Sequence, residues 1–340
     1  MGARFEVAPL STSTPEPKRR AKGAEAPGKE QFMSQVTGLH HITMLAASAP
    51  TVDTFWRGDM GLARVRRTVN SDRPDAYHLL YGDAAGTPGT LITVHPFANL
   101  ARGVPGVGEI AEPALSLAPG ALQEWRPYLM RGGYAVEPPI RWFDRNRNLF
   151  DGPDGARLAL QIDPQEQRPP RPLPFDGRQG VRGVHSVTLR VRDGGAAGAM
   201  LEALGFTERA REDHVVRYTV GEGRGGAGRT VDVAELPDGP PARLGAGSVH
   251  HLAFAVADGD ALRGTEEALR GGGYEVAGTA DRGGYASFHF RGPENLLFEV
   301  ATEGPGIAVG EAPGTLGERL WLPPALEPRR ASIETALEPL

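Results

Sequence analysis

The sequence predicts an α+β protein in which four βαβββ modules form two pseudo-symmetric half-barrel pairs. Two observations support this fold. Four short apolar segments resemble one another, and each is followed by a helical stretch that ends at a glycine and an apolar residue. The glycines lie 72, 72 and 68 residues apart, at Gly61, Gly133, Gly205 and Gly273. A glycine just past the last helical turn is a frequent helix stop, because it adopts the left-handed conformation without steric cost.

The apolar segments are the predicted first strands of the modules: Leu39–Thr43, Ala114–Leu117, Val184–Thr188 and Val249–Phe254. Strand-like runs follow each helix, such as Tyr77–Tyr81 with Thr90–Val94, and Ala286–Phe290 with Leu296–Ala301. A single strand–helix–three-strand unit leaves its sheet half covered and must pair with a second unit to bury it. Four units therefore give two pairs.

Five parts are predicted along the chain. They are a disordered N-terminal tail (1–35), modules 1 and 2 (36–164), a linker (165–181), modules 3 and 4 (182–304) and a C-terminal extension (305–340). The tail is rich in Ser, Pro, Glu, Lys and Arg and has too few large apolar residues to offset the entropy of ordering. The linker is dense in Pro, Arg and Gln, as is typical of spacers between folded units.

The composition excludes several classes of protein. The 340 residues contain no cysteine, which rules out disulfides, thiolate metal sites and cysteine nucleophiles. A net charge of -5 gives no footprint for nucleic acid or for an anionic membrane surface. No apolar run approaches the roughly 20 residues that a membrane span needs, and none follows the charges at Lys18–Arg20, as a secretory signal would require. We therefore expect a cytoplasmic protein without nucleic-acid or membrane partners.

Histidines are candidate metal ligands because two His-His pairs occupy the same point of the repeat. His40-His41 lies in module 1 and His250-His251 in module 4, whereas module 3 has His185-Ser186 at this place. Neighbouring side chains of a strand point to opposite faces, so we expect only one histidine of each pair to face the concave side of its sheet. The residues alone leave open which one.

Glu299 is the candidate acidic ligand, because it interrupts the apolar strand Leu296–Val300. A buried carboxylate is costly unless it is paired or bound to a metal. The matching places in modules 1 and 2 are Thr93 and Ala159, neither of which is a ligand. Two imidazoles and one carboxylate form the facial triad of non-haem Fe(II) oxygenases, which leaves coordination positions for substrate and O2. Fe(II) is the expected cofactor, and Mn(II) fits the same ligands.

The chain resembles the vicinal oxygen chelate superfamily and, within it, the ring-cleaving, hydroquinone-type dioxygenases. The resemblance covers about Gly38 to Arg330. The matching motifs are Gly38-Leu-His-His-Ile-Thr43, Tyr77-His-Leu-Leu-Tyr-Gly-Asp83, Gly86-Thr-Pro-Gly-Thr90, Gly183-Val-His-Ser-Val-Thr188, Val249-His-His-Leu-Ala-Phe254 and Thr315-Leu-Gly-Glu-Arg-Leu-Trp-Leu-Pro-Pro324. The last motif is distinctive, since nothing in the bare repeat requires it.

The resemblance implies that the metal ligands are the second histidine of each pair, His41 and His251, together with Glu299. It also implies that modules 1 and 4 pair, because they share one metal. His40 matches a histidine thought to assist proton transfer, and Arg282 matches an arginine near the substrate. His78 is a weaker candidate, because a hydrogen-bonded strand histidine explains it equally well.

The sequence departs from the family pattern beside the expected metal ligand Glu299. His289 stands where the family usually has Tyr, and Pro293-Glu294-Asn295 stands where it usually has Pro-Gly-Gly. A phenol titrates near pH 10 and an imidazole near pH 6.5. His289 is therefore expected either to replace the phenol as a hydrogen-bond donor or to act as an acid or base at neutral pH.

The function expected from these features is Fe(II)-dependent, extradiol-type ring cleavage of a dihydroxylated aromatic, hydroquinone or catechol, with O2. Such an enzyme is an oxidoreductase that incorporates molecular oxygen, with His40, Arg282 and His289 as catalytic candidates. One alternative is an isomerase or lyase of the same superfamily that uses the metal as a Lewis acid. Another is a drug-sequestering binding protein, although that function does not need a metal triad. A homo-oligomer is expected from family resemblance only.

Overall fold

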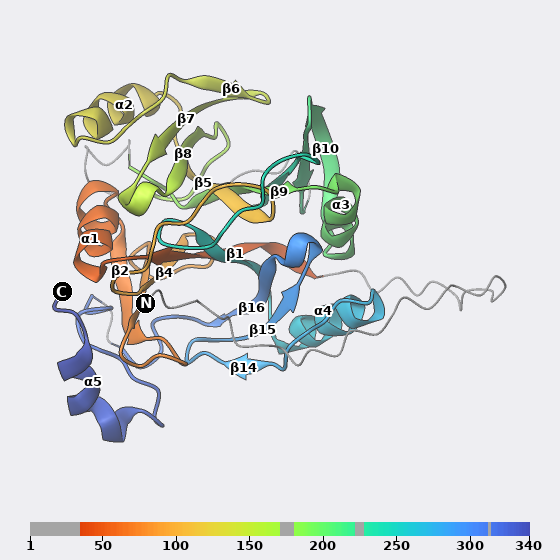
Figure 1. The fold of residues 1–340 in the computed structure, drawn as a ribbon. Coiled ribbons are helices and arrows are strands. Elements are labelled where there is room, and N and C mark those ends of the chain that lie inside the picture. Colours follow the sequence, from red (N-terminus) through yellow and green to blue (C-terminus); the bar gives the residue numbers. More distant parts are fainter. Residues whose placement is uncertain (1–34, 171–179, 222–227, 312–313) are drawn as a thin grey trace. The chain divides into compact units, whose positions relative to one another are not determined.

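The computed structural model describes residues 35–170, 180–221, 228–311 and 314–340 (Figure 1). The predicted tail, residues 1–35, lies outside the described residues except for Gln35, and so does the part of the predicted linker from 171 to 179. Among the helices of the described ranges, none combines the length and the apolar character that a bilayer span needs.

Each module has the predicted order of one strand, one helix and a group of strands. Module 1 contains β1 (Val36–Ala46), α1 (Ala49–Asp53) continued by a π-helical turn (Thr54–Asp59), β2 (Ala63–Val69), β3 (Tyr77–Gly82) and β4 (Leu91–Pro96). Module 2 contains β5 (Glu109–Leu117), α2 (Leu122–Arg131), β6 (Ile140–Trp142), β7 (Arg145–Asp151), a 3-10 turn (Pro153–Gly155) and β8 (Arg157–Ile162).

Modules 3 and 4 repeat this order. Module 3 contains β9 (Val184–Val191), α3 (Gly194–Ala203), β10 (Thr207–Glu212), β11 (Val215–Thr219) and β12 (Thr230–Glu235). Module 4 contains β13 (Val249–Val256), α4 (Gly259–Gly271), β14 (Ala280–Asp281), β15 (Tyr285–Arg291), a 3-10 turn (Pro293–Asn295) and β16 (Leu297–Pro305). The C-terminal residues add a 3-10 turn (Glu327–Arg329) and α5 (Arg330–Ala336).

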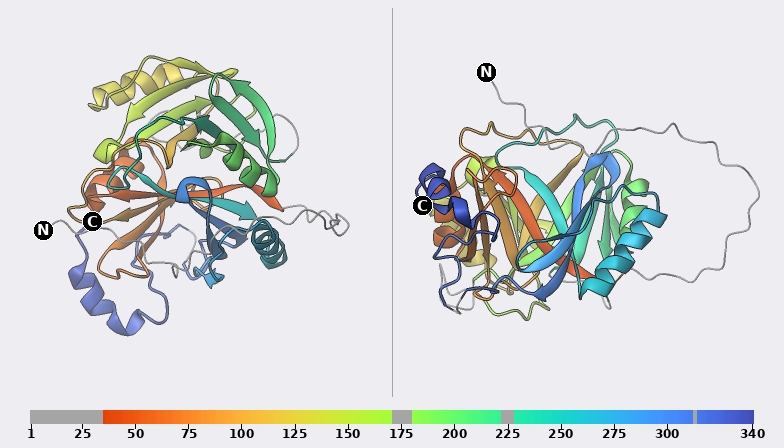
Figure 2. Two further views of the ribbon diagram at one scale, coloured as in Figure 1. Left: turned by 45° about the vertical axis from the view of Figure 1, so that its right-hand side comes forward. Right: turned by 90° about the horizontal axis from the view of Figure 1, so that it is seen from below.

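The strands form two eight-stranded sheets, which confirms the predicted fold class. One sheet has the order β14-β15-β16-β13-β1-β4-β3-β2 and joins modules 1 and 4, as the predicted shared metal requires. The other has the order β10-β11-β12-β9-β5-β8-β7-β6 and joins modules 2 and 3. In each sheet the first strands of the two modules pair antiparallel at the centre, β1 with β13 and β5 with β9 (Figure 2).

The glycines used to define the repeat have the conformation predicted for them. Their φ angles are 70°, 85°, 87° and 88° in chain order, all in the left-handed region. The helices pack on one face of each sheet, and the main hydrophobic cluster combines residues of both sheets with residues of the helices. Examples from the four helical segments are Trp56, Trp125, Met200 and Leu269. The opposite face of the module 1–4 sheet carries a smaller apolar cluster that includes Ala301, two residues after Glu299 on β16.

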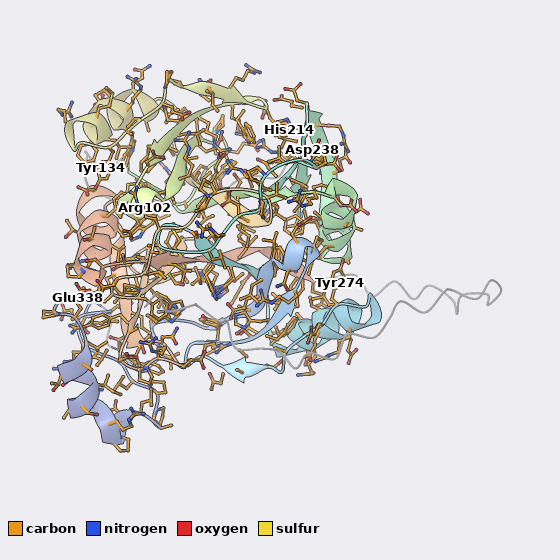
Figure 3. All side chains as sticks on the ribbon, in the orientation of Figure 1. Arg102, Tyr134, His214, Asp238, Tyr274 and Glu338 are labelled. Atoms are coloured by element: carbon orange, nitrogen blue, oxygen red, sulfur yellow. The ribbon has the colours of Figure 1, made fainter. Side chains whose placement is uncertain are left out.

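The C-terminal extension packs against β2 and against the β14–β15 turn. Trp321 donates its backbone N–H to the carbonyl of Arg67 at 2.8 Å, and the Arg66 guanidinium lies 4.4 Å from the ring centroid of Trp321. Arg66 is buried and donates to the carbonyls of Ile307, Val309 (3.0 Å) and Gly283 (3.2 Å). Nearer the C-terminus, the Glu338 carboxylate accepts a hydrogen bond from the backbone N–H of Ala49 at 2.9 Å. Figure 3 labels the Glu338 side chain.

Arg66→Lys is expected to loosen the C-terminal extension, because an ammonium group cannot replace a planar fork that reaches several carbonyls and stacks on an indole. Loss of one hydrogen bond to a charged group costs about 1.5–3 kcal/mol, so cleavage of the extension in limited proteolysis should accelerate about 10-fold or more. Arg67→Lys is the matched control, because that guanidinium donates to Tyr77 Oη. Equal cleavage rates in the two variants would contradict the anchoring role of Arg66.

Candidate metal centre

The structure brings the three predicted metal ligands together on the concave face of the module 1–4 sheet. His41 Nε2 and His251 Nε2 each lie 3.1 Å from Glu299 Oε2, and the two nitrogens are 3.3 Å apart. Their donor atoms form a group of the size that can hold a metal ion, and all three residues are buried. Residues 41, 251 and 299 come from three adjacent strands, β1, β13 and β16. Their role as metal ligands stays a prediction.

Both histidines of each pair reach this site, which corrects the expectation that only one of them would. Leu39 pairs with Phe254 and His41 with Ala253, so His40 is the extra residue of a β-bulge in β1. His250 is likewise the extra residue of β13. A bulge interrupts the alternation of side chains along a strand. His40 Nδ1 therefore lies 2.8 Å from His41 Nδ1, and His250 Nδ1 lies 2.9 Å from His251 Nδ1.

The charges of the cluster suit a cation. Burial alone would raise the pKa of Glu299, but its contacts with His41 and His251 hold the pKa well below the usual range, so the carboxylate is ionised. Burial lowers the pKa of His251 well below its usual value, so that imidazole is neutral. Either two imidazole protons or one cation must lie between the three converging atoms, which are His41 Nε2, His251 Nε2 and Glu299 Oε2. A cation also neutralises the buried carboxylate, which is otherwise costly.

The neighbouring imidazoles are arranged to orient the candidate ligands. Burial is the main cause that lowers the pKa of His40 to about 3 and that of His250 to about 4, so both are neutral near pH 7. A neutral His40 can accept a hydrogen bond from the Nδ1–H of His41. The lone pair on His41 Nε2 then faces the centre. Ligating histidines usually donate their second N–H to such a partner.

His289 and Arg282 lie on the open side of the cluster. The exposed fraction of the side chain rises from 3% for Glu299 and 8% for His251 to 25% for His289. His289 Nε2 is 3.8 Å from Glu299 Oε2, and its Nδ1 is 3.4 Å from Arg282 Nη2. Burial is the main cause that lowers the pKa of His289. Since arginine only donates, the neutral His289 ring accepts at Nδ1 and carries its proton on Nε2.

His78 stacks on another imidazole near the candidate metal centre. Its ring stacks on His95 with centroids 4.2 Å apart, and His95 Nδ1 is 3.2 Å from Asn70 Nδ2. Burial is the main cause that lowers the pKa of His78 to about 3. The His95 ring in turn lies 6.3 Å from that of His250. His41, His251 and Glu299 also act on His78 electrostatically, so His78 belongs to the surroundings of the centre.

Sequence reasoning missed Thr43. Its hydroxyl lies 2.9 Å from His251 Nε2 and 2.7 Å from the Thr93 hydroxyl, and both threonines are buried. The signal that could have found it is spacing, since Thr43 lies two residues after His41 and so on the same strand face. It was overlooked because threonine in a strand ordinarily signals β propensity alone.

Comparison with known proteins gives relatives over nearly the whole chain, although no protein-family model matches the sequence. A Bacillus subtilis protein named as a ring-cleaving dioxygenase, MhqA, is 34% identical over an alignment of 315 residues that covers 90% of this chain and 99% of that protein. The chlorohydroquinone/hydroquinone 1,2-dioxygenase of Sphingobium indicum is 32% identical over an alignment of 308 residues that covers 87% of this chain and 94% of that enzyme.

Solved structures share the fold. The crystal structure of a Bacillus subtilis protein named as a dioxygenase has a TM-score of 0.85 and 30% identity, covering 90% of this chain and 98% of that one. Glyoxalase I of Zea mays has a TM-score of 0.59 and 12% identity, covering 78% of this chain and 92% of that one. The second likeness shows the βαβββ architecture alone.

Proposed function

Because the chain belongs to the ring-cleaving dioxygenases of the vicinal oxygen chelate superfamily, we propose that it opens a dihydroxylated aromatic ring with O2 and that Fe(II) is its cofactor, with Mn(II) as the other metal that suits the ligands. The observation that carries the proposal is the buried convergence of His41, His251 and Glu299. These side chains would hold the metal. When bound, it would supply a Lewis acid and a source of electrons for O2 activation.

We propose a hydroquinone or catechol as substrate and extradiol-type cleavage next to a hydroxyl-bearing carbon. The Sphingobium relative is named for hydroquinones, and a two-histidine, one-carboxylate set suits a neutral diol that loses protons on binding. The proposed entrance lies on the side of His289 and Arg282, because the His289 side chain is 25% exposed. Substrate that enters there meets an Nε2–H donor from His289 and the charge of Arg282, both of which stabilise a deprotonated hydroxyl group.

The test is anaerobic reconstitution of the metal-free protein with Fe(II), followed by oxygen-uptake assays over a panel of hydroquinones and catechols. We expect at least one of these diols to cause O2 consumption. One molecule of O2 should be consumed for each aromatic ring lost, as measured by absorbance. Bound iron without O2 uptake for every diol would refute ring cleavage. Anaerobic turnover with Zn(II), Co(II) or Ni(II) would favour the Lewis-acid isomerase or lyase instead.

The proposed donor role of His289 predicts different effects for two substitutions. His289→Phe removes the Nε2–H donor and should lower kcat about 10²–10³-fold, the usual cost of losing one oxyanion donor. His289→Tyr restores a donor at this place and should stay within about 10-fold of the unchanged protein. Both variants should bind iron with unchanged stoichiometry, because His289 is not a proposed ligand. Equal kcat values for the two variants would show that the donor does not matter.

A further inference from the structure

The module 2–3 sheet repeats the position of the metal centre with different side chains. Asp232 pairs with Thr188 on the neighbouring strand, as Glu299 pairs with Ala253. Ser186, two residues before Thr188, stands at the place of the metal-ligand candidate His251. Strand register therefore makes Asp232 the counterpart of Glu299, which the sequence analysis did not find.

Arg217 pairs with Asp232 across the strands as His289 pairs with Glu299, so a guanidinium group faces the second carboxylate. Arg217 binds Asp232 through two bonds of 2.8 Å, and Trp142 Nε1 donates to the same carboxylate at 2.7 Å. Asp232 is fully buried and Arg217 nearly so. Since arginine keeps its charge at all relevant pH values, the carboxylate already has its counter-ion. This half of the protein is therefore not expected to need a metal at that place.

A cavity of about 370 Å³ lies beside the Arg217–Asp232 pair. Its lining includes three arginines and two ring-bearing residues: Arg145, Arg209, Arg217, His185 and Phe143. The Arg217 guanidinium carbon is 4.0 Å from the centre of the Phe143 ring, so planar groups already stack at this wall. The volume lies in the range of small-molecule sites.

Two carboxylates also line the cavity, but each has a partner. Glu212 accepts the backbone N–H of Phe143 at 3.0 Å, and Asp144 lies 3.6 Å from Arg145. Arg145 is bound in addition to Asp163 at 2.8 Å. Within the described part of the chain, Arg209 donates to the Thr219 hydroxyl at 3.1 Å and has no carboxylate within ion-pair distance. Arg209 is thus, of the three arginines of this wall, the one whose charge no carboxylate of the described residues balances.

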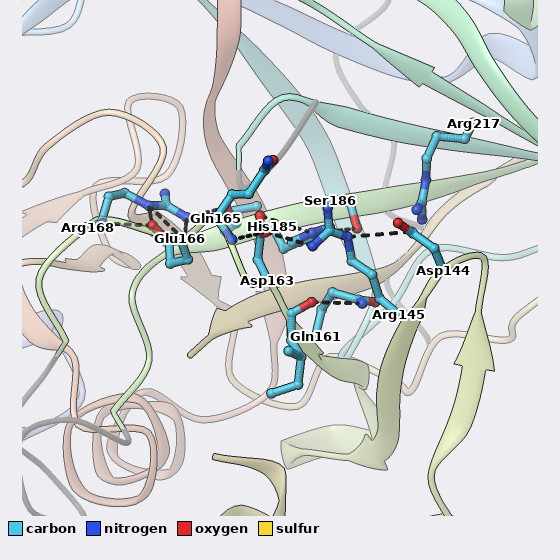
Figure 4. A network of polar contacts seen from close by, with 12 residues as sticks. Asp144, Arg145, Gln161, Asp163, Gln165, Glu166, Arg168, His185, Ser186 and Arg217 are labelled. Carbon is cyan, nitrogen blue, oxygen red and sulfur yellow. Dashed lines mark hydrogen bonds and ion pairs between the residues drawn. The ribbon is translucent and has the colours of Figure 1, made fainter. Parts of the chain in front are cut away.

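His185 supplies an unused polar atom among the residues that line the cavity, and Figure 4 shows this side chain beside Ser186 and Asp163. Its Nδ1 lies 3.0 Å from the Ser186 hydroxyl, whereas its buried Nε2 has no hydrogen-bond partner among the described residues. Asp163 Oδ2 lies 3.8 Å from His185 Nε2, which is too far for a hydrogen bond. Burial and then the surrounding arginines, Arg217 and Arg145 first, lower the pKa of His185 well below its usual value. The ring is neutral and stands in a positive field.

We propose that this cavity binds a monocyclic aromatic carboxylate. The carboxylate accepts hydrogen bonds from Arg209 and from His185 Nε2–H, and the ring lies along Phe143. Arginine forks match carboxylate geometry, and an aromatic ring suits a wall built from a phenyl ring and a guanidinium. The inference is independent of the proposed ring-cleaving function, since every lining residue belongs to modules 2 and 3.

Benzoate binding to the Fe(II)-reconstituted full-length protein tests the proposal, with benzamide as the uncharged analogue and acetate as the carboxylate without a ring. Titration calorimetry should give a saturable benzoate site that is about 10-fold or more tighter than that for either analogue, as expected for a charge-assisted hydrogen bond together with ring contact. Equal affinities for benzoate and benzamide, or no saturation by benzoate up to its solubility limit, would overturn the proposal.

Substitutions of two exposed arginines on β10 test where benzoate binds. Arg209→Gln should weaken benzoate binding about 10-fold, whereas Arg211→Gln should not, because Arg211 is outside the cavity wall and binds Glu208. Glu299→Gln should retain the benzoate site. Loss of benzoate binding in Glu299→Gln would mean that benzoate binds at the metal centre, and equal effects of the two arginine substitutions would place the ligand elsewhere. Either outcome overturns the proposal.

Discussion

Glu299→Gln should abolish stoichiometric binding of Fe(II), while the protein stays folded. The substitution keeps the shape of the side chain and removes the only negative charge among the three proposed ligands. Loss of a hydrogen-bond partner behind a ligand already costs about 10–100-fold in metal affinity, so loss of a ligand itself should cost more than about 100-fold. Iron per chain, measured after anaerobic reconstitution and desalting, should fall from one to near zero.

Glu303→Gln is the matched control, because Glu303 lies on the same strand but is exposed and bonds the Thr37 hydroxyl. It should bind iron normally. Fe(II) should also raise the Tm of the unchanged protein and of Glu303→Gln but not that of Glu299→Gln, since a ligand stabilises only the state that binds it. Tight iron retained by Glu299→Gln would show that another carboxylate holds the metal.

Arg217→Met should destabilise the protein by about 3–5 kcal/mol, because it leaves the buried Asp232 carboxylate without its counter-ion. The double substitution Arg217→Met with Asp232→Leu should recover most of this loss, since replacing both members of a buried pair by apolar groups is often close to neutral. Urea unfolding of the metal-free protein measures the free energy of unfolding for the single and double variants.

Arg270→Met supplies the comparison for this effect. Arg270 pairs with Glu266 along the exposed face of α4, with 50% of the arginine side chain accessible. Such a pair contributes less than about 1 kcal/mol. An Arg217→Met variant that costs no more than Arg270→Met, or a double variant no more stable than the single one, would mean that Asp232 does not depend on the guanidinium.

Each of the two half-barrels has a buried carboxylate, but the residues around the two carboxylates differ. Each has an acidic residue on its concave face next to the central strands, Glu299 in one and Asp232 in the other. A buried carboxylate needs a positive partner. The residue across from it differs, since His289 pairs with Glu299 and Arg217 pairs with Asp232. Arg217 supplies the positive partner of Asp232, whereas a metal ion is the partner proposed for Glu299.

The sequence by itself determined the repeat, the helix stops and the strand that carries Glu299. These features depend on local physics. A glycine ends a helix where a left-handed residue is needed, and a lone carboxylate in an apolar strand is costly unless it has a partner. The motifs at Gly38–Thr43 and Val249–Phe254 also indicated the family, because each carries a His-His pair within a short apolar strand.

The tertiary structure alone decided how the paired histidines are used. The sequence predicted alternation along β1 and β13, but bulges at His40 and His250 turn both members of each pair toward the centre. A bulge depends on how a strand registers with a partner about 210 residues away, as His41 and His251 show. The sequence did not predict the partners of Thr43, Asp232 and Arg66 for the same reason. Contacts between distant segments exist only once the sheets have formed.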